Sequence, residues 1–212
     1  MAKITKIEIQ KRNKERINLF LDGEYAFSLS LELMYKEGLK VNQEVDINIL
    51  KTLAKKESYI RCKESALKII ERNYKTEKEV RDKLKLKGYE EDDIDSSIEF
   101  LKNYNFLNDC NYTKAFIKDK INIQGSQKIK YNLIKKGISK EIVQEQLSSI
   151  NKDDEKITAL NLAKKKLNII KKSENDEYKI SGKLYRFLIS KGYGYDIVKE
   201  VVKEVMALDD FE

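Results

Sequence analysis

The sequence has 212 residues, of which 37% are charged and 41% hydrophobic; it carries a formal net charge of +7 and contains no His, Pro or Trp. Without histidine the chain cannot form a Ser-His-Asp or Cys-His triad, an HExxH zinc site or an imidazole acid-base centre, so we expect a protein that is not an enzyme. No run of more than seven residues lacks a charged side chain, so we expect no membrane span or secretory leader, and hence a cytoplasmic protein.

Alternating apolar residues near the N-terminus predict three short antiparallel strands, at 3–11, 16–21 and 25–29. Asp22-Gly23 separates the last two and is typical of a type I′ hairpin turn, which requires positive φ at both central residues. In the third strand we expect one face to carry Tyr25, Phe27 and Leu29.

Helical patterns follow this sheet. We predict a short helix from about Ser30 to Glu37, stopped by Gly38, and a long helix that begins near Asp46. Three short strands are not stable alone in water, so we expect the sheet to pack on these helices.

The rest of the chain contains one unit three times. The segments that begin at Val80, Ile129 and Leu184 align without a gap, and each has a Lys-Gly pair at the same place. Relative to the glycine, apolar residues recur at positions −8, −4, +1, +6, +10 and +13 in all three copies. These spacings predict two amphipathic helices joined by a tight turn, in which the glycine takes the left-handed C′ position.

A further helical pattern precedes each pair, so the unit is a three-helix repeat. Such a unit is too small to bury enough apolar surface alone, and we expect its neighbours to stabilise it by stacking. The predicted fold is mainly α: three tandem three-helix repeats in an elongated array, preceded by a small antiparallel β-sheet subdomain. The expected boundaries are 1–57 for the sheet subdomain and 58–107, 108–150 and 151–212 for the repeats.

The short glycine turn would also fit a helix-turn-helix that reads the DNA major groove. Three copies with equal turns favour a scaffold instead, because a DNA reader normally needs one recognition helix per half-site. Acids at the start of the third helix of each copy would also repel phosphate. In the first copy these acids are Glu90, Glu91, Asp92, Asp93 and Asp95. They could be proposed as a Mg²⁺ site, but the other copies lack them and acids are common where helices begin, so we expect no metal.

The basic excess is concentrated in the centre of the chain. Between Tyr112 and Lys140 there are eight lysines and one acid, Asp119, and a second run without acids spans Lys156 to Ser173. We therefore expect an anionic partner to bind here, although a merely solvated face remains the alternative. The candidate binding residues are Lys114, Lys118, Lys120, Lys128, Lys130, Lys135, Lys136, Lys164, Lys165 and Lys166.

Three stretches of the sequence resemble a known family: ALKIIERNYKTEKEVRDKLKLKGY, FLNDCNYTKAFIKDK and QGSQKIKYNLIKKGI. Together they resemble the RecX family of bacterial regulators of the recombinase RecA, and ITKIEIQKRNKERINLFLDGEYAFSL is similar to the β-rich extension of some members. The resemblance covers essentially the whole chain. The third repeat departs most from the family pattern, in its first helix and in the loop KKSENDEYK.

The resemblance implies a regulator of RecA in DNA repair, homologous recombination and the SOS response. It implies a protein without catalytic residues that binds RecA filaments on single-stranded DNA and inhibits the recombinase, ATPase and coprotease activities. We expect this protein to be a monomer without cofactor or metal. The alternatives that composition and spacing leave open are a stand-alone helical DNA-binding module and a general helical interaction scaffold.

Overall fold

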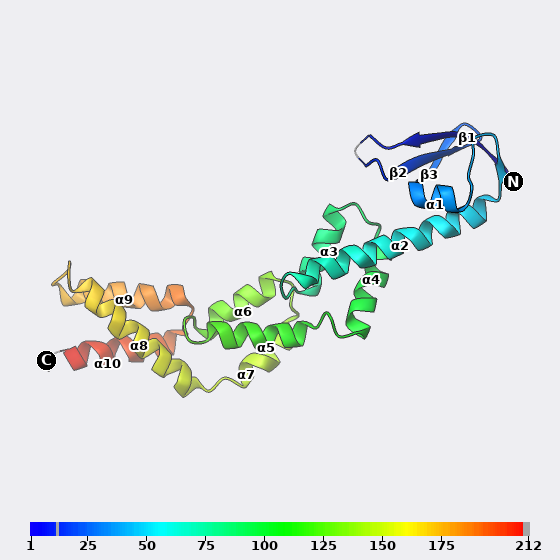
Figure 1. Cartoon of the computed structure of the whole chain (residues 1–212). Coiled ribbons are helices and arrows are strands. Elements are labelled where there is room, and N and C mark those ends of the chain that lie inside the picture. Colours follow the sequence, from blue (N-terminus) through cyan, green and yellow to red (C-terminus); the bar gives the residue numbers. More distant parts are fainter. Residues whose placement is uncertain (12, 210–212) are drawn as a thin grey trace. The chain divides into compact units, whose positions relative to one another are not determined.

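The computed structural model describes residues 1–11 and 13–209. They form two compact units, the first made of residues 1–72 and 81–104 and the second of residues 73–80 together with those from 105 onward. The predicted fold class is confirmed: the chain is mainly helical, with three three-helix domains and a small N-terminal antiparallel sheet (Figure 1).

The sheet of the first unit has four antiparallel strands in the order β3-β2-β1-β4. Asp22 and Gly23 have φ values of 51° and 93°, as the predicted type I′ turn requires. The fourth strand, of two residues, pairs with the start of β1 and was not expected, because two residues carry no detectable alternation. The strands are β1 (Ala2–Ile9), β2 (Arg16–Leu21), β3 (Glu24–Ser30) and β4 (Glu44–Val45).

One prediction about the sheet is wrong: Tyr25 does not share the buried face with Leu29. Tyr25 is 58% exposed, whereas Leu29 is fully buried. The register between β2 and β3 shifts after Leu19, which lies opposite Phe27, so that Phe20 comes to lie opposite Tyr25. The irregularity turns Tyr25 to the outer face, where its ring makes an edge contact with Phe20 at 5.9 Å.

Two helices begin where the sequence predicts. The Ser30 side chain caps α1 (Leu31–Lys36) by accepting a hydrogen bond from the Leu33 N–H. The Asp46 side chain caps α2 (Ile47–Glu71) in the same way. Leu50 at the start of α2 is buried in the core of the sheet, so the sheet packs on the helix as expected.

The repeats supply the remaining helices. The first repeat contributes α3 and α4 in addition to the end of α2, and the other two repeats contribute three helices each. Their bounds are α3 (Glu77–Leu86), α4 (Glu91–Asn103), α5 (Asp109–Lys120), α6 (Ser126–Lys135), α7 (Lys140–Ser148), α8 (Lys152–Ile170), α9 (Glu177–Lys191) and α10 (Tyr195–Asp209).

Each repeat turns at its glycine in the predicted way. Gly88, Gly137 and Gly192 have φ values of 80°, 89° and 89°, which only glycine adopts without a Cβ penalty. In all three turns the glycine N–H donates to the carbonyl three residues before it, and the next N–H donates to the carbonyl five residues before it. This pair of bonds is the Schellman motif.

The aligned apolar positions form the cores of the repeats. At −8, −4 and +6 from the glycine every residue is fully buried: Val80, Ile129 and Leu184, then Leu84, Leu133 and Leu188, then Ile94, Val143 and Val198. Position +1 is buried at Ile138 and Tyr193 and half-buried at Tyr89. The gap-free alignment of the three copies therefore has the correct register.

Candidate basic binding surface

The ten candidate lysines all lie in the second unit, on three helices and one helix end. Lys114, Lys118 and Lys120 are on α5, and Lys128, Lys130 and Lys135 are on α6, which ends at the C-cap residue Lys136. Lys164, Lys165 and Lys166 are on α8. They differ in whether their charge is free for a partner.

On α6 two of these lysines flank an exposed aromatic ring. Lys130, Tyr131 and Lys135 are exposed; Tyr131 and Lys135 are four residues apart and share one side of the helix, and Lys130 lies about 100° around the helix from Tyr131. Tyr131 is 65% exposed. Exposed lysines beside an aromatic ring can contact phosphate while a base stacks on the ring.

Lys136 differs from the others because it is bound within the protein. Its Nζ donates to Glu79 Oε1 at 2.6 Å and lies 5.6 Å from the centre of the Tyr112 ring. Burial opposes the charge on Lys136, but the hydrogen bonds to Glu79 and Tyr112 outweigh it and raise the pKa of the ammonium. Lys136 therefore contributes to a contact inside the protein and not to a binding surface.

Lys136 belongs to a joint that occurs twice in the second unit. At the start of α3, Thr76 Oγ1 donates to the Lys136 carbonyl at 2.7 Å, and the Glu77 N–H donates to Asp109 Oδ1. At the start of α6 the residues at the same two positions also donate to the next repeat, but Gly125 does so from its backbone and not from a hydroxyl. The Gly125 N–H donates to the Lys191 carbonyl at 3.0 Å, and the Ser126 N–H donates to Glu155 Oε1 at 2.7 Å.

The second joint brings backbones into direct contact. A Cβ atom on Gly125 would lie 2.3 Å from the Gly192 carbonyl oxygen, and one on Gly192 would lie 2.2 Å from Lys128 Cβ. A larger residue at either glycine would therefore clash where the start of α6 meets the end of α9. The contact fixes the first turn of α6 against the end of α9.

Lysines of both basic runs contact the last turn of α9 near this approach. Lys128 Nζ donates to the Ser190 carbonyl at 2.9 Å. Lys166 of α8 and Lys191 of α9 both place their ammonium groups over the Phe187 ring, at 5.6 and 5.5 Å from its centre. Within the described part of the chain none of these three lysines forms an ion pair.

The sequence analysis missed Lys191 and Phe187 as members of this cluster. Lys191 is in the aligned Lys-Gly pair, equivalent to Lys136, and that position was the available signal. Phe187 has no such signal, because a single aromatic residue in an amphipathic helix looks like an ordinary core residue.

The acids at the start of α4 have partners within the first unit. Arg81 donates to both Glu91 and Asp95, Lys85 pairs with Glu91, and Ser58 donates to Asp93. Over residues 1–11 and 13–209 there is no group of three or more acids or cysteines placed to hold a metal ion. Among the same residues no helix is long and apolar enough to cross a membrane.

Family models match four segments of the chain. The regulatory protein RecX N-terminal domain matches residues 2–46, and the first, second and third three-helix domains of RecX match residues 62–101, 108–147 and 153–202.

Proteins of this family are similar to the chain over most of its length. The chain is 66% identical to a regulatory protein RecX of Clostridium beijerinckii, over 99% of this chain and 98% of the relative. It is 61% identical to one of Clostridium botulinum (strain Eklund 17B), with complete coverage of both. A crystal structure of regulatory protein RecX superposes with a TM-score of 0.67 at 25% identity, over 96% of this chain and 100% of that chain. The crystal structure of RecX from Lactobacillus salivarius gives 0.64 at 29% identity, over 70% of this chain and 96% of that one.

Proposed function

The chain belongs to the RecX family of regulatory proteins, and from this we propose that it binds RecA filaments on single-stranded DNA and inhibits the recombinase, ATPase and coprotease activities of RecA. In this proposal the protein is a cytoplasmic monomer that acts by binding and carries out no chemistry. The proposed repeats are 58–107, 108–150 and 151–212, and the proposed binding surface lies on the second and third of them.

The observation that carries the proposal is the gathering of Lys128, Lys166 and Lys191 at one joint. Two basic runs that are separate in sequence meet there, and the glycine contact holds them in place before any partner arrives. A prearranged cluster spends less free energy on ordering flexible side chains when it binds an anion. The filament offers such anions as DNA phosphates or acidic side chains of RecA.

The exposed lysines extend this surface. Lys130 and Lys135 flank Tyr131 on α6, and Lys164 and Lys165 are exposed on α8 next to Lys166. Direct contact with single-stranded DNA is favoured by Tyr131, because an exposed ring between lysines suits an unstacked base.

The test is inhibition of RecA ATPase on single-stranded DNA by the full chain and by a charge variant. The variant replaces four exposed lysines that have no partner within the described residues: Lys130→Gln, Lys135→Gln, Lys164→Gln and Lys165→Gln. Glutamine keeps helix propensity nearly unchanged, so the change isolates charge. We expect the parent to inhibit, and the variant to need about ten times more protein and to show a shallower dependence on salt.

A matched control removes the same charge from the first unit: Lys36→Gln, Lys51→Gln, Lys56→Gln and Lys68→Gln, all exposed. We expect this control to inhibit like the parent. If both variants lose inhibition equally, net charge alone matters and the surface is not a site. If the parent does not inhibit RecA at all, the proposed function is wrong.

A further inference from the structure

The glycine turn of the first repeat is open on the side where the other two turns are covered. A Cβ atom on Gly137 would clash with the side chain of Lys78, and one on Gly192 would clash with Lys128, because a helix start of the preceding repeat lies against each turn. A Cβ atom on Gly88 would meet no atom of the described residues within 4 Å. The Gly88 turn therefore offers a surface that its two equivalents use for the contact between repeats.

The backbone of this turn is open as well. The Lys136 carbonyl accepts a hydrogen bond from the Thr76 hydroxyl at 2.7 Å, and the Lys191 carbonyl accepts one from the Gly125 N–H at 3.0 Å. Lys87 is the equivalent residue, and within residues 1–11 and 13–209 its carbonyl accepts no hydrogen bond. Lys87 is exposed, whereas Lys136 and Lys191 are half-buried. The Lys87 carbonyl is therefore available to a donor from outside the chain.

A hollow of about 850 Å³ lies beside this turn within the first unit. Its lining includes Lys87, Gly88 and Tyr89 as well as residues of β3 and α2. One turn of a helix, about 10 to 12 Å wide with a pitch of about 5.4 Å, occupies about 420 to 610 Å³ and so fits this volume. In the described part of the chain no hydrogen bond or ion pair joins the strands to residues 87–93, so the sheet does not close the hollow.

The first covered turn shows which chemistry fits this kind of site. The helix start that covers it is a capping box: the Thr76 N–H donates to Glu79 Oε2 and the Glu79 N–H donates to Thr76 Oγ1, both at 3.2 Å. The same two side chains bind the turn, because the hydroxyl donates to the Lys136 carbonyl and the carboxylate accepts from Lys136 Nζ. At the open turn Lys87 Nζ donates to Ser65 Oγ at 2.9 Å and has no carboxylate partner among the described residues.

We propose that the Gly88 turn binds the first turn of an α-helix of another protein, one that begins with Ser or Thr followed three residues later by Glu. The hydroxyl of this helix donates to the Lys87 carbonyl, and its carboxylate accepts from Lys87 Nζ. An ammonium group has three donors, so Lys87 keeps its hydrogen bond to Ser65 as well. The ligand thus repeats the contact that Thr76 and Glu79 make with Lys136.

A second copy of the chain does not supply this ligand. Among the helices of the described residues α3 alone begins with such a box, and that box is already bound at the Lys136 turn. Two other helices begin with a capping serine, Ser30 and Ser139, but they have Leu33 and Ile142 at the position of the glutamate. The ligand is therefore a helix of a different protein.

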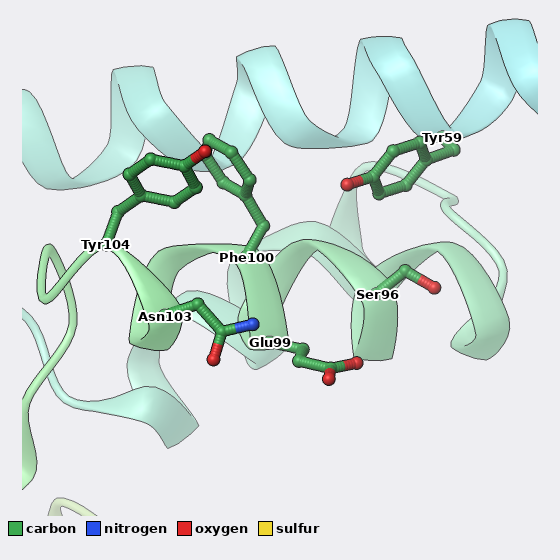
Figure 2. Close-up of a pocket in the computed structure, with 6 residues that line it drawn as sticks. All are labelled: Tyr59, Ser96, Glu99, Phe100, Asn103 and Tyr104. Atoms are coloured by element: carbon green, nitrogen blue, oxygen red, sulfur yellow. The ribbon is translucent and has the colours of Figure 1, made fainter.

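A second hollow of the first unit, of about 390 Å³ between α2 and α4, serves as the control surface. Figure 2 shows that Phe100 and Tyr104 point towards α2, whereas the Glu99 carboxylate points away from their rings. These side chains do not converge on one group of a ligand. A change at Glu99 therefore tests whether any altered charge in this unit affects binding.

The experiment is a titration of the full ¹⁵N-labelled chain with an acetylated and amidated peptide of residues 73–86, which contains the box. Two control peptides carry Thr76→Ala or Glu79→Gln and keep the same apolar residues. A short isolated helix is only partly formed, so we expect the parent peptide to shift the Lys87, Gly88 and Tyr89 amide signals with a dissociation constant of about 1 to 20 mM. Each control peptide should bind about threefold to tenfold more weakly.

A charge reversal identifies the lysine that takes part. We expect Lys87→Glu to weaken binding of the parent peptide about threefold to tenfold, and to bind a peptide with Glu79→Lys more tightly than the parent peptide. Lys83→Gln, an exposed lysine of α3, and Glu99→Gln should leave binding unchanged. The three peptides are compared on the unaltered chain, so that comparison does not depend on how the variants fold.

Four outcomes would each overturn the proposal. They are absence of shifts at residues 87–89, equal binding of the parent and control peptides, the same shifts caused by a short oligo-dT, and the same shifts when the chain alone is concentrated. The Gly137 turn is already covered, and its amide signal should stay in place; a larger shift there than at Gly88 would also contradict the proposal. None of these readouts involves RecA, so they stand or fall separately from the proposed function.

Discussion

Lys136 and Glu79 are 57 positions apart in the sequence, yet Lys136 Nζ lies 2.6 Å from Glu79 Oε1. Both side chains are less than one-third exposed, at 31% and 27%. The pair ties the first turn of α3 to the end of α6, beside the hydrogen bond from Thr76 to the Lys136 carbonyl. A lysine counted among the candidates for binding thus has an internal carboxylate as its partner.

This pair gives stability a defined dependence on pH. Burial opposes ionisation of Glu79, but the hydrogen bonds from Lys136 and from the Thr76 N–H, together with the positive charges of Lys136 and Lys75, outweigh it and lower the pKa of the carboxyl below its ordinary 4.5. The lowered pKa contributes stability above pH 4.5 that is lost as the pH falls through the folded-state value. The raised pKa of Lys136 contributes stability below its ordinary 10.5 that is lost as the pH rises through the folded-state value.

We therefore expect Glu79→Gln to cost about 1 kcal/mol of unfolding free energy near neutral pH. The difference from the parent should shrink in acid, where the parent carboxyl is protonated as well. Urea unfolding of both proteins at a series of pH values measures this. Glu8→Gln, which breaks an exposed pair with Lys6, is the control and should change little. An equal loss at neutral and acidic pH would show that the glutamate acts through packing alone.

Leu133 occupies a fully buried position of the second repeat, so Leu133→Ala should cost about 2 to 5 kcal/mol. Its equivalents Leu84 and Leu188 are also fully buried and should respond alike. Leu86→Ala is the matched control, because Leu86 is 87% exposed and its loss should cost under about 0.5 kcal/mol. Chemical denaturation gives all four values, and similar costs for Leu86 and Leu133 would contradict the assigned cores.

The glycine joint predicts opposite effects for two Gly→Ala changes. At Gly125 the new Cβ would meet the backbone of Gly192, so we expect Gly125→Ala to destabilise the second unit by about 1 to 3 kcal/mol. Gly182 lies inside α9 with open space around it, and Gly182→Ala should stabilise by about 0.5 to 1 kcal/mol. Thermal melts rank the three proteins; a Gly125→Ala protein as stable as the parent would mean that the backbones do not approach as described.

Tyr193 carries a buried hydroxyl that has no hydrogen-bond partner among the described residues. Burial, assisted by the negative charge of Glu155, raises the pKa of Tyr193 to about 12. A raised pKa contributes stability that is present below the ordinary value of 10 and is lost as the pH rises towards 12. We expect Tyr193→Phe to be about as stable as the parent at neutral pH, because it removes an unpaired polar group.

Above about pH 10 the two proteins should differ, since the phenylalanine variant has no hydroxyl to ionise. Unfolding followed by circular dichroism as the pH rises would measure this. We expect the parent to lose stability more steeply than Tyr193→Phe, with the exposed Tyr178→Phe as the control. Parallel curves for parent and Tyr193→Phe would show that this hydroxyl is not buried.

Local signals made most of the fold predictable. The helix starts at Ser30 and Asp46 follow from their capping side chains, and the turns at Gly88, Gly137 and Gly192 follow from one repeated Lys-Gly pair. Each of these depends on residues only a few positions apart. The local chemistry and the final fold agree at these places, which is why a single sequence was enough.

Features that depend on distant residues were not predictable in this way. The register shift that exposes Tyr25 depends on how two strands pair, and β4 exists only because β1 offers it a partner. The same holds for the basic surface. Its ten lysines could be named from charge alone. Whether a lysine is paired inside the protein, as Lys136 is, or lies at the end of α9, as Lys128 does, depends on contacts between repeats.

The joint between repeats also bears on self-association. It is a head-to-tail contact: one repeat offers a helix start at position −12 from its glycine, and the next accepts it at its own glycine turn. Contacts of this kind can in principle add units without limit and form open polymers. In the third repeat position −12 is Ile180. The helix α9 begins three residues earlier, at Glu177, so Ile180 lies within the helix, where it is buried. The third repeat thus has no helix start to offer, so this contact cannot extend from it to a second copy of the chain.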